Sequence, residues 1–270
     1  MKKKLLMLTL AACLLFLMPT TKADAASVTE LKEGQNYKID LNGDGRKETF
    51  KYTTLETSSK SILKLYINGK HVYSHSESYG WPGKVCLADF NKKDKYKEIC
   101  FEFNSDSDCL EIMKILRYQN KKLKAVASRR TSNSEFSGRV TIANAQKGDG
   151  TVTVRIDTPY YETSLGCYFV DIQYQIKKGT LVKTSPTIYP VSSNWKKSPY
   201  TLSKQVTFTT TRTGTKKAFT LAKGQVVYLN KVSCKKEGTT ISIQVRTRSG
   251  KLGWLKLKNF NFYKEAYAWG

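Results

Sequence analysis

The sequence predicts an all-β fold of short antiparallel strands, and two observations lead to this prediction. Apolar side chains alternate with polar ones along several segments, which is the pattern of a half-buried strand, whereas a helical period of about 3.6 residues is hard to find. Residue pairs that favour tight turns separate these segments. Asn68 and Gly69 are the clearest pair, because a type I′ hairpin turn needs positive φ at both central positions.

The strands are expected as hairpins along the chain. Turn residues recur at Asn120 with Lys121, at Lys178 with Gly179 and at Ser249 with Gly250. The segments on either side carry the alternating pattern: Leu63, Leu65 and Ile67; Val152, Val154 and Ile156; Tyr168, Val170, Ile172, Tyr174 and Ile176; Ile241, Ile243 and Val245.

An internal repeat organises the first two thirds of the chain. Loops rich in Asp and Asn begin at Asp40, Asp89 and Asn144, which are 49 and then 55 residues apart. A strand-like segment follows each loop, and a hairpin turn follows that segment. Each unit is therefore expected to contain four short antiparallel strands, the layout of a propeller blade.

These units resemble the VCBS/FG-GAP type of repeat, whose blades carry a D-x-[DN]-x-D-G-x-x-[DE] loop between their first two strands. The resemblance covers roughly residues 35–187 and is carried best by residues 40–48, in part by residues 88–98 and weakly by residues 143–150. It implies a propeller-like arrangement. Because three blades do not close an ordinary propeller, an open or shortened relative or a compact meander sandwich is expected.

The first loop is the sharpest chemical signal in the sequence. Side-chain oxygens of Asp40, Asn42, Asp44 and Glu48, with the Arg46 carbonyl, form a set of hard ligands around a glycine turn, which favours one Ca²⁺ site. The alternative is a metal-free loop in which Asp and Asn side chains accept hydrogen bonds from backbone amides.

The other two loops are expected to be metal-free structural turns. In the second loop, Asp89, Asn91, Asp94 and Glu98 are spaced one residue wider, and four lysines crowd them and offer to neutralise the carboxylates. The third loop retains only Asn144 and Asp149, too few oxygens for a metal.

The C-terminal part resembles the bacterial SH3-like barrel. Residues 221–229 and 241–245 are strand-like, and Gly253 with Trp254 in the segment 249–255 is the most specific element of the resemblance. The usual opening N-V-R-x-x-P is absent, which places a ligand groove on the opening strand in doubt. The expected division is a leader at 1–25, a repeat domain at 27–187, a linker at 188–202, and an SH3-like barrel with an aromatic tail at 203–270.

The N-terminal residues are typical of a secretory signal peptide. Three lysines at residues 2–4 precede an apolar run at 5–18, and residues 23–25 supply the small-x-small pattern before cleavage near Ala25. A lipobox ending at Cys13 is the weaker alternative, because the apolar run continues past it. We therefore expect a secreted or cell-surface-associated protein without a transmembrane segment in the mature chain.

Composition indicates an anionic partner. The formal net charge of +24 draws such a protein to polyanions, and for an exported chain these are anionic cell-wall polymers, acidic glycans, phospholipid headgroups or extracellular nucleic acid. A lysine-rich solvated surface without a dedicated partner is the alternative. The mature chain holds an odd number of cysteines, expected mainly as buried small apolar residues with one disulfide possible: Cys86, Cys100, Cys109, Cys167 and Cys234.

The sequence shows no catalytic constellation. His71 and His75 are the only histidines, and a strand would hold them too far apart to bind one metal ion. Trp81 and Trp195 lie in expected loops and are candidate ligand-binding aromatics, with packing as the alternative. We therefore expect an exported, non-catalytic binding protein with one calcium-type loop. The rivals are a glycan hydrolase with paired carboxylates and an extracellular nucleic-acid binder.

Overall fold

The structure is a computed structural model of the whole chain. It describes residues 26–105, 109–130, 139–159, 164–185, 187–234, 241–257 and 263–268. The expected leader, its cleavage site at Ala25 and Cys13 lie outside the described residues.

The described residues confirm the all-β prediction. They form β-strands and a single turn of 3-10 helix, η3 (Trp195–Lys197). No described helix is long and apolar enough to cross a membrane.

Three antiparallel units of four strands follow one another in the chain, as the repeat predicts. Unit 1 is a separate four-stranded sheet in sequence order: β3 (Tyr37–Ile39), β4 (Glu48–Glu56), β5 (Ser61–Ile67) and β6 (Lys70–Glu77). Unit 2 has the same order: β7 (Trp81–Ala88), β8 (Glu98–Asn104), β9 (Leu110–Gln119) and β10 (Lys122–Arg130). Unit 3 consists of β11 (Val140–Ile142), β13 (Thr151–Asp157), β14 (Phe169–Lys177) and β15 (Thr180–Lys183).

Units 2 and 3 join into one curled sheet of nine strands. The joint is parallel, and Ser128 of β10 lies opposite Thr180 of β15. β2 (Thr29–Glu30) adds to the free edge of β7. β1 (Ala26–Ser27) pairs with β12 (Ala145–Gln146) inside the third loop, so the first described residues are tied to unit 3.

The expected hairpin turns are present in all three units. Asn68 and Gly69 have φ of 52° and 76°, and Asn120 and Lys121 have 51° and 59°. Lys178 and Gly179 have 48° and 78°. Both central residues of each turn thus adopt the left-handed conformation that a type I′ turn requires.

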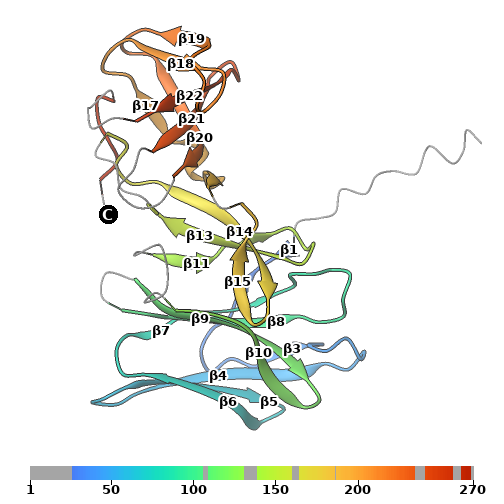
Figure 1. Cartoon of the computed structure of the whole chain (residues 1–270). Coiled ribbons are helices and arrows are strands. Elements are labelled where there is room, and N and C mark those ends of the chain that lie inside the picture. Colours follow the sequence, from blue (N-terminus) through green and yellow to red (C-terminus); the bar gives the residue numbers. More distant parts are fainter. Residues whose placement is uncertain are drawn as a thin grey trace, which may run out of the picture.

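The units stack face to face (Figure 1), and unit 2 lies between the other two. Strand β8 is buried on both faces. Phe101 and Phe103 point into the core shared with unit 1, whereas Cys100 points into the core shared with unit 3. Consecutive apolar residues at 99–101 are therefore the signature of a strand covered on both sides.

The C-terminal residues form a separate seven-stranded sheet. Its strands are β16 (Ile188–Pro190), β17 (Pro199–Thr201), β18 (Val206–Thr209), β19 (Lys217–Leu221), β20 (Val226–Ser233), β21 (Ser242–Thr247) and β22 (Leu252–Lys256). The segment 188–202, expected as a linker, contributes β16, η3 and β17, and Tyr189 and Tyr200 within it are buried. It is a packed part of the C-terminal sheet.

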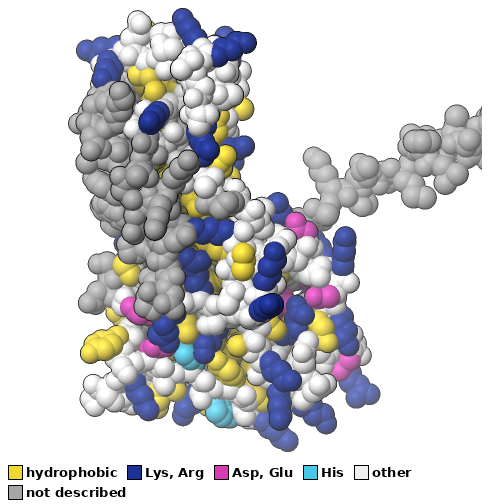
Figure 2. Space-filling model, viewed as in Figure 1, with side chains coloured by type: hydrophobic (Ala, Val, Ile, Leu, Met, Phe, Trp, Pro, Cys, Tyr) yellow, Lys and Arg dark blue, Asp and Glu magenta, His cyan; other side chains and the backbone are white. Residues whose placement is uncertain are grey.

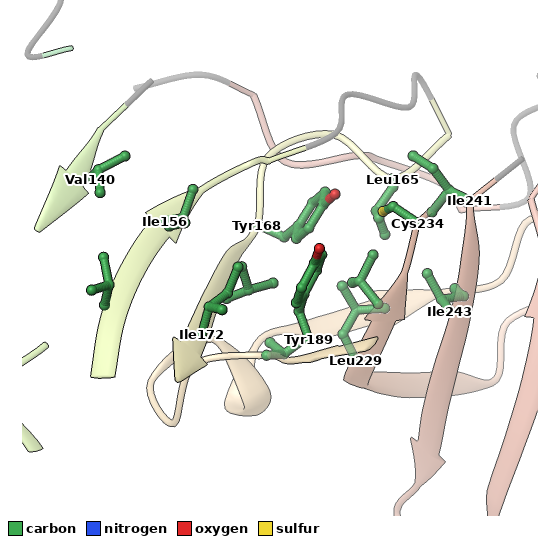
Figure 3. Packing of buried hydrophobic residues seen from close by; sticks show 14 of the residues in the cluster. Val140, Ile156, Leu165, Tyr168, Ile172, Tyr189, Leu229, Cys234, Ile241 and Ile243 are labelled. Atoms are coloured by element: carbon green, nitrogen blue, oxygen red, sulfur yellow. The ribbon is translucent and has the colours of Figure 1, made fainter. Parts of the chain in front are cut away.

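One continuous core joins unit 3 to this sheet. In Figure 3, Tyr168 and Ile172 of unit 3 lie beside Tyr189 and Leu229 of the C-terminal sheet, and all four side chains are buried. The aromatic tail reinforces this joint, because the Cys167 N–H donates to the Tyr267 carbonyl (2.7 Å).

The five cysteines are free thiols in the described structure, and four of them are buried. Cys86 lies opposite Cys100 across β7 and β8, inside the core between units 2 and 3. The expectation of buried small apolar residues holds for all but Cys109, which is partly exposed.

Candidate functional site

The first loop is a closed network of hydrogen bonds between its own side chains and backbone. Asp40 accepts the N–H groups of Gly43 (2.7 Å) and Gly45 (3.0 Å) on its two carboxylate oxygens. Asp44 accepts the Arg46 N–H (2.8 Å), and this bond is the main reason that the pKa of Asp44 lies below its usual value. This is the arrangement that the Asx-turn alternative describes.

Two carboxylates of the first loop converge on one amide. The Asn42 Nδ2 atom donates to Asp44 Oδ2 (3.1 Å) and to Glu48 Oε1 (3.4 Å). The buried Glu48 also accepts the Leu41 N–H (3.0 Å). A cation that displaced this N–H donor would meet oxygens from both acids, so the donor set fits a hard cation there. No described cluster has three or more His, Cys, Asp or Glu side chains placed for a metal, and calcium at this loop stays a prediction.

The second loop repeats this arrangement with the Arg117 guanidinium in the place of the Asn42 amide. Glu98 accepts the Phe90 N–H (3.4 Å), as Glu48 accepts that of Leu41. Its other oxygen binds Arg117 of β9, whose Nε lies 2.9 Å away and whose Nη2 also contacts both Glu98 and Asp94. Arg117 therefore neutralises these acids, whereas the sequence suggested the four neighbouring lysines for this role.

The length of β9 explains why an arginine of the neighbouring strand reaches the acids of the second loop and not those of the first. Glu98 lies opposite Arg117, and β9 continues for two residues beyond this pair. In unit 1, β5 ends at Ile67 opposite Phe50, two residues short of Glu48. No residue of β5 therefore lies opposite Glu48, whose strand partner is Ile39 of β3 on the other side.

The third loop uses hydroxyl and amide groups. Asp149 accepts the N–H (3.0 Å) and the hydroxyl (2.6 Å) of Thr151. The buried Gln146 exchanges hydrogen bonds with the backbone of Thr153, accepting its N–H at 2.7 Å and donating to its carbonyl at 2.9 Å. These contacts agree with the expected structural turn.

The three loops lie side by side at one end of the units. The Lys97 N–H donates to the Leu41 carbonyl (3.2 Å), which joins the first loop to the second. The Lys92 N–H donates to the Gly148 carbonyl (3.0 Å), which joins the second to the third. Gly43 is required at the first contact, because a Cβ atom there would lie 2.4 Å from the Lys95 carbonyl oxygen.

A pocket of about 830 Å³, here named the basic pocket, opens between the first loop and unit 2. Four of the five residues expected as calcium ligands line it, and Asp40 does not. Two hairpin turns and the second loop supply the rest of its wall. Its cationic side chains are Arg46, Lys47, Lys70, Lys95 and Lys121.

A second recess, here named the threonine groove, crosses the C-terminal sheet and has a volume of about 580 Å³. The opening strand β18, the loop after it and β22 form most of its wall, so a groove on the opening strand exists despite the missing motif. No lining residue is acidic. The lining residues are Thr207, Thr209, Arg212, Thr213, Gly214, Thr215, Ser233, Ser242, Trp254, Leu255 and Lys256.

The two candidate aromatics have different environments. Trp81 begins β7 and is 40% exposed, next to Tyr79, which is 83% exposed. Trp195 packs its ring against Phe169 and Tyr267, with centroids 5.4 and 4.9 Å away. Packing accounts for Trp195, whereas Trp81 remains open to a ligand.

His75 belongs to a polar network between units 1 and 2. Its Nε2 lies 2.8 Å from a carboxylate oxygen of Glu77, and its Nδ1 lies 3.2 Å from the Lys114 ammonium. Burial, then the Lys114 charge, lowers the pKa of His75. Arg130 pairs with Glu77 at 2.6 Å. The other histidine, His71, stacks edge-on to Tyr66.

The sequence did not predict the role of Arg117 at the second loop or the presence of either recess. Arg117 lies between apolar residues of a strand. This pattern indicates a polar side chain on one face of β9 but does not identify its partner. The repeated threonines at 207–215 were a signal for the groove, since four of them, Thr207, Thr209, Thr213 and Thr215, line it.

Comparison of the chain with protein-family models, with curated proteins and with solved structures finds no match in any of the three.

Proposed function

We propose that the chain is an exported, non-catalytic binding protein that associates with an anionic extracellular polymer, either a cell-wall polymer or an acidic glycan. The threonine groove carries this proposal. Six of its lining residues carry hydroxyl groups, of which those of Thr207, Thr209 and Ser233 also hydrogen-bond within the protein. The cations Arg212 and Lys256 line it as well, without an opposing carboxylate. Hydroxyl groups suit the hydroxyls and ring oxygens of a polyol or sugar chain, and the two cations suit its charges.

Arg212 is held in place for such a role. Its side chain is half-buried, and its Nη1 donates to the Ser233 hydroxyl at 2.6 Å. A guanidinium that is already oriented loses less side-chain entropy when it binds a carboxylate or phosphate. The indole of Trp254 is 8% exposed and forms an apolar part of the wall.

The positive charge of the whole chain supports association over a longer range. Figure 2 shows Lys and Arg side chains over both the units and the C-terminal sheet, whereas the Asp and Glu side chains visible on that face lie over the units. Such a surface raises the rate of encounter with a polyanion, and this effect weakens as salt screens the charges. The groove would then supply the contacts that hold at higher salt.

Calcium at the first loop is part of the proposal. The extracellular side is where calcium concentrations are high enough for a site of modest affinity to fill. Bound calcium would replace the Asn42 N–H between Asp44 and Glu48, where the structure places the two carboxylates around one donor.

Retention on purified wall material tests the proposal. The chain is incubated with intact wall, with wall stripped of its anionic polymers and with nucleic acid, each over a series of salt concentrations. We expect retention on intact wall only, and a loss of about tenfold in affinity for Arg212→Gln, because a charge-assisted contact contributes roughly 1.5–3 kcal/mol. Arg248→Gln is the matched control, since Arg248 is an exposed arginine of the same region outside the groove.

Three results would contradict the proposal. Equal retention on stripped wall would exclude an anionic polymer as the ligand. Equal losses in the two arginine variants would assign binding to net charge and not to the groove. Release of soluble sugar from the wall by the chain would favour the glycan hydrolase.

A further inference from the structure

The basic pocket has a chemistry of its own, away from the threonine groove. Five exposed cationic side chains converge on it from four separate segments: the first loop, the second loop, the start of β6 and the turn between β9 and β10. Like charges that gather at one recess repel one another when it is empty. An anion placed there would relieve that repulsion.

None of these cations lies within ion-pair distance of an acidic group among the described residues, and Asp44 attracts Arg46 and Lys95 only over a longer distance. Arg117, Arg130 and Arg155 each form ion pairs with Asp or Glu, whereas none of the five pocket cations does so in the described part of the chain. Lys95 lies over the ring of Tyr96 at 5.5 Å, which positions its ammonium group at the wall of the pocket. The positive charge of the pocket is therefore available to a ligand.

The two carboxylates in the wall are already occupied. Asp44 accepts hydrogen bonds from the Arg46 N–H and the Asn42 amide. Glu48 is buried and accepts the Leu41 N–H and the same amide. Both acids are thus partly neutralised by hydrogen bonds inside the first loop. The five cationic side chains that line the pocket therefore outweigh them.

The remaining wall suits a hydroxylated ligand. Gln119 and Asn120 bring side-chain amides, which can both donate to and accept from hydroxyl groups, and Asn68 brings an amide whose oxygen already accepts the Thr49 N–H (2.8 Å). The volume of about 830 Å³ is within the range of pockets that enclose small molecules, and it would take a segment of a polymer and not only a single ion.

The aromatic rings in the wall are not free for base stacking. Arg117 lies over the ring of Tyr96 at 4.6 Å, in addition to Lys95. Tyr118 is 8% exposed. Proteins that bind single-stranded nucleic acid stack bases on open aromatic faces, and the pocket offers none among its lining residues.

We infer that the basic pocket binds the phosphate groups of a polyol- or sugar-phosphate polymer. The site adds a second contact to the proposed function, on which this choice of polymer rests. Lysines act as point charges that suit the compact charge of phosphate, and the amides would bind the hydroxyls between successive phosphates.

The experiment uses the full chain and a synthetic oligo(glycerol phosphate) of defined length, titrated by calorimetry at several salt concentrations. Lys47→Gln/Lys95→Gln/Lys121→Gln removes three pocket charges. We expect its affinity to fall at least tenfold and its slope of log K against log salt to fall by about three, since each phosphate contact contributes close to one.

Two controls separate the pocket from bulk charge and from folding. Lys60→Gln/Lys177→Gln/Lys223→Gln removes the same charge from exposed lysines outside both recesses, and we expect less than a threefold loss of affinity, because charges beyond the Debye length are screened. Matching circular dichroism spectra and thermal midpoints would show that both variants fold.

The outcomes are distinct. Equal weakening in the two triple variants, or no binding of the oligomer, would overturn the inference. Equally tight binding of single-stranded DNA with the same number of phosphates, lost in the same pocket variant, would assign the pocket to nucleic acid. If Arg212→Gln abolishes wall retention while the pocket variant binds the oligomer normally, the proposed function stands and this inference fails. If the pocket variant loses oligomer binding while Arg212→Gln retains wall binding, the basic pocket is supported as a phosphate site and the threonine groove is excluded as the wall-binding site.

Discussion

The ion pair between Arg117 and the second loop gives the sharpest stability prediction. Glu98 has a side chain that is 1% exposed, and burial raises its pKa against the opposing effect of Arg117. Replacing Arg117 by Met keeps the apolar stem and removes the charge. The change leaves a buried carboxylate with one weak hydrogen bond, from the Phe90 N–H at 3.4 Å.

The expected cost is about 3 kcal/mol of unfolding free energy, at the lower end for a broken buried pair, because the Arg117 side chain is 22% exposed. The thermal midpoint should fall by about 6–12 °C for a chain of this size. The double variant Arg117→Met/Glu98→Gln should recover most of the loss, since no buried charge remains. For both variants at neutral pH, urea denaturation measures the unfolding free energy and calorimetry measures the thermal midpoint.

Arg155→Met is the matched control for this prediction. Arg155 pairs with Asp171 at 2.9 Å, but both side chains are about a fifth exposed, so this pair should contribute less than about 1 kcal/mol. If Arg117→Met costs no more than Arg155→Met, the second loop is not held by a buried charge pair. The first and second loops would then not be stabilised by equivalent contacts to their buried glutamates.

Three further predictions concern calcium, pH and the aromatic tail. Calcium should raise the thermal midpoint, and Asp44→Ala should remove that increase; an undiminished increase would exclude the first loop. Burial and a neighbouring ammonium group lower the pKa of His75 from about 6.5, so its neutral form stabilises the fold above pH 6.5 and this contribution is lost as pH falls through the lowered pKa. His75→Gln should flatten the acid side of the stability profile, and an unchanged profile would contradict the assignment. Gly166→Ala should cost about 3 kcal/mol or more, because its φ is 67° and the new Cβ would lie 2.2 Å from the Tyr267 carbonyl oxygen. Gly179→Ala, with φ of 78° and nothing within 4 Å, should cost only about 1–2 kcal/mol; equal costs would show that the tail contact is unimportant.

The fold followed from local signals because strands and type I′ turns are local features. Asn68 with Gly69 and Lys178 with Gly179 place positive φ at two successive positions, and the structure has those angles. The linker expectation relied on proline and serine content alone. Tyr189 and Tyr200 lie within that segment and are buried, so apolar content outweighed turn composition there.

The candidate site could be predicted only in part from the sequence, because its residues come from different units. The oxygen-bearing side chains of the first loop are close in sequence, so the sequence alone identified them as a candidate set. The basic pocket also needs Lys70, Lys95 and Lys121, which the chain brings together only through the stacking of unit 1 on unit 2. Arg117 is 19 residues from Glu98, and their pairing depends on where the intervening turn falls.

The acidic side chains of the three loops are stabilised by different donors: an amide in the first, a guanidinium in the second and a hydroxyl in the third. Each unit places acidic or amide oxygens at the same end, where neighbouring loops contact through backbone hydrogen bonds. In the second loop, a longer β9 carries Arg117 over the acids. In the first loop, β5 stops short, so the acids rely on the Asn42 amide. The same shortfall leaves room beside the first loop for the basic pocket. Of the three loops, the first loop lacks an internal cation beside its acids, and it is therefore the loop best suited to take a ligand from solution, whether that ligand is calcium at the acids or phosphate at the lysines.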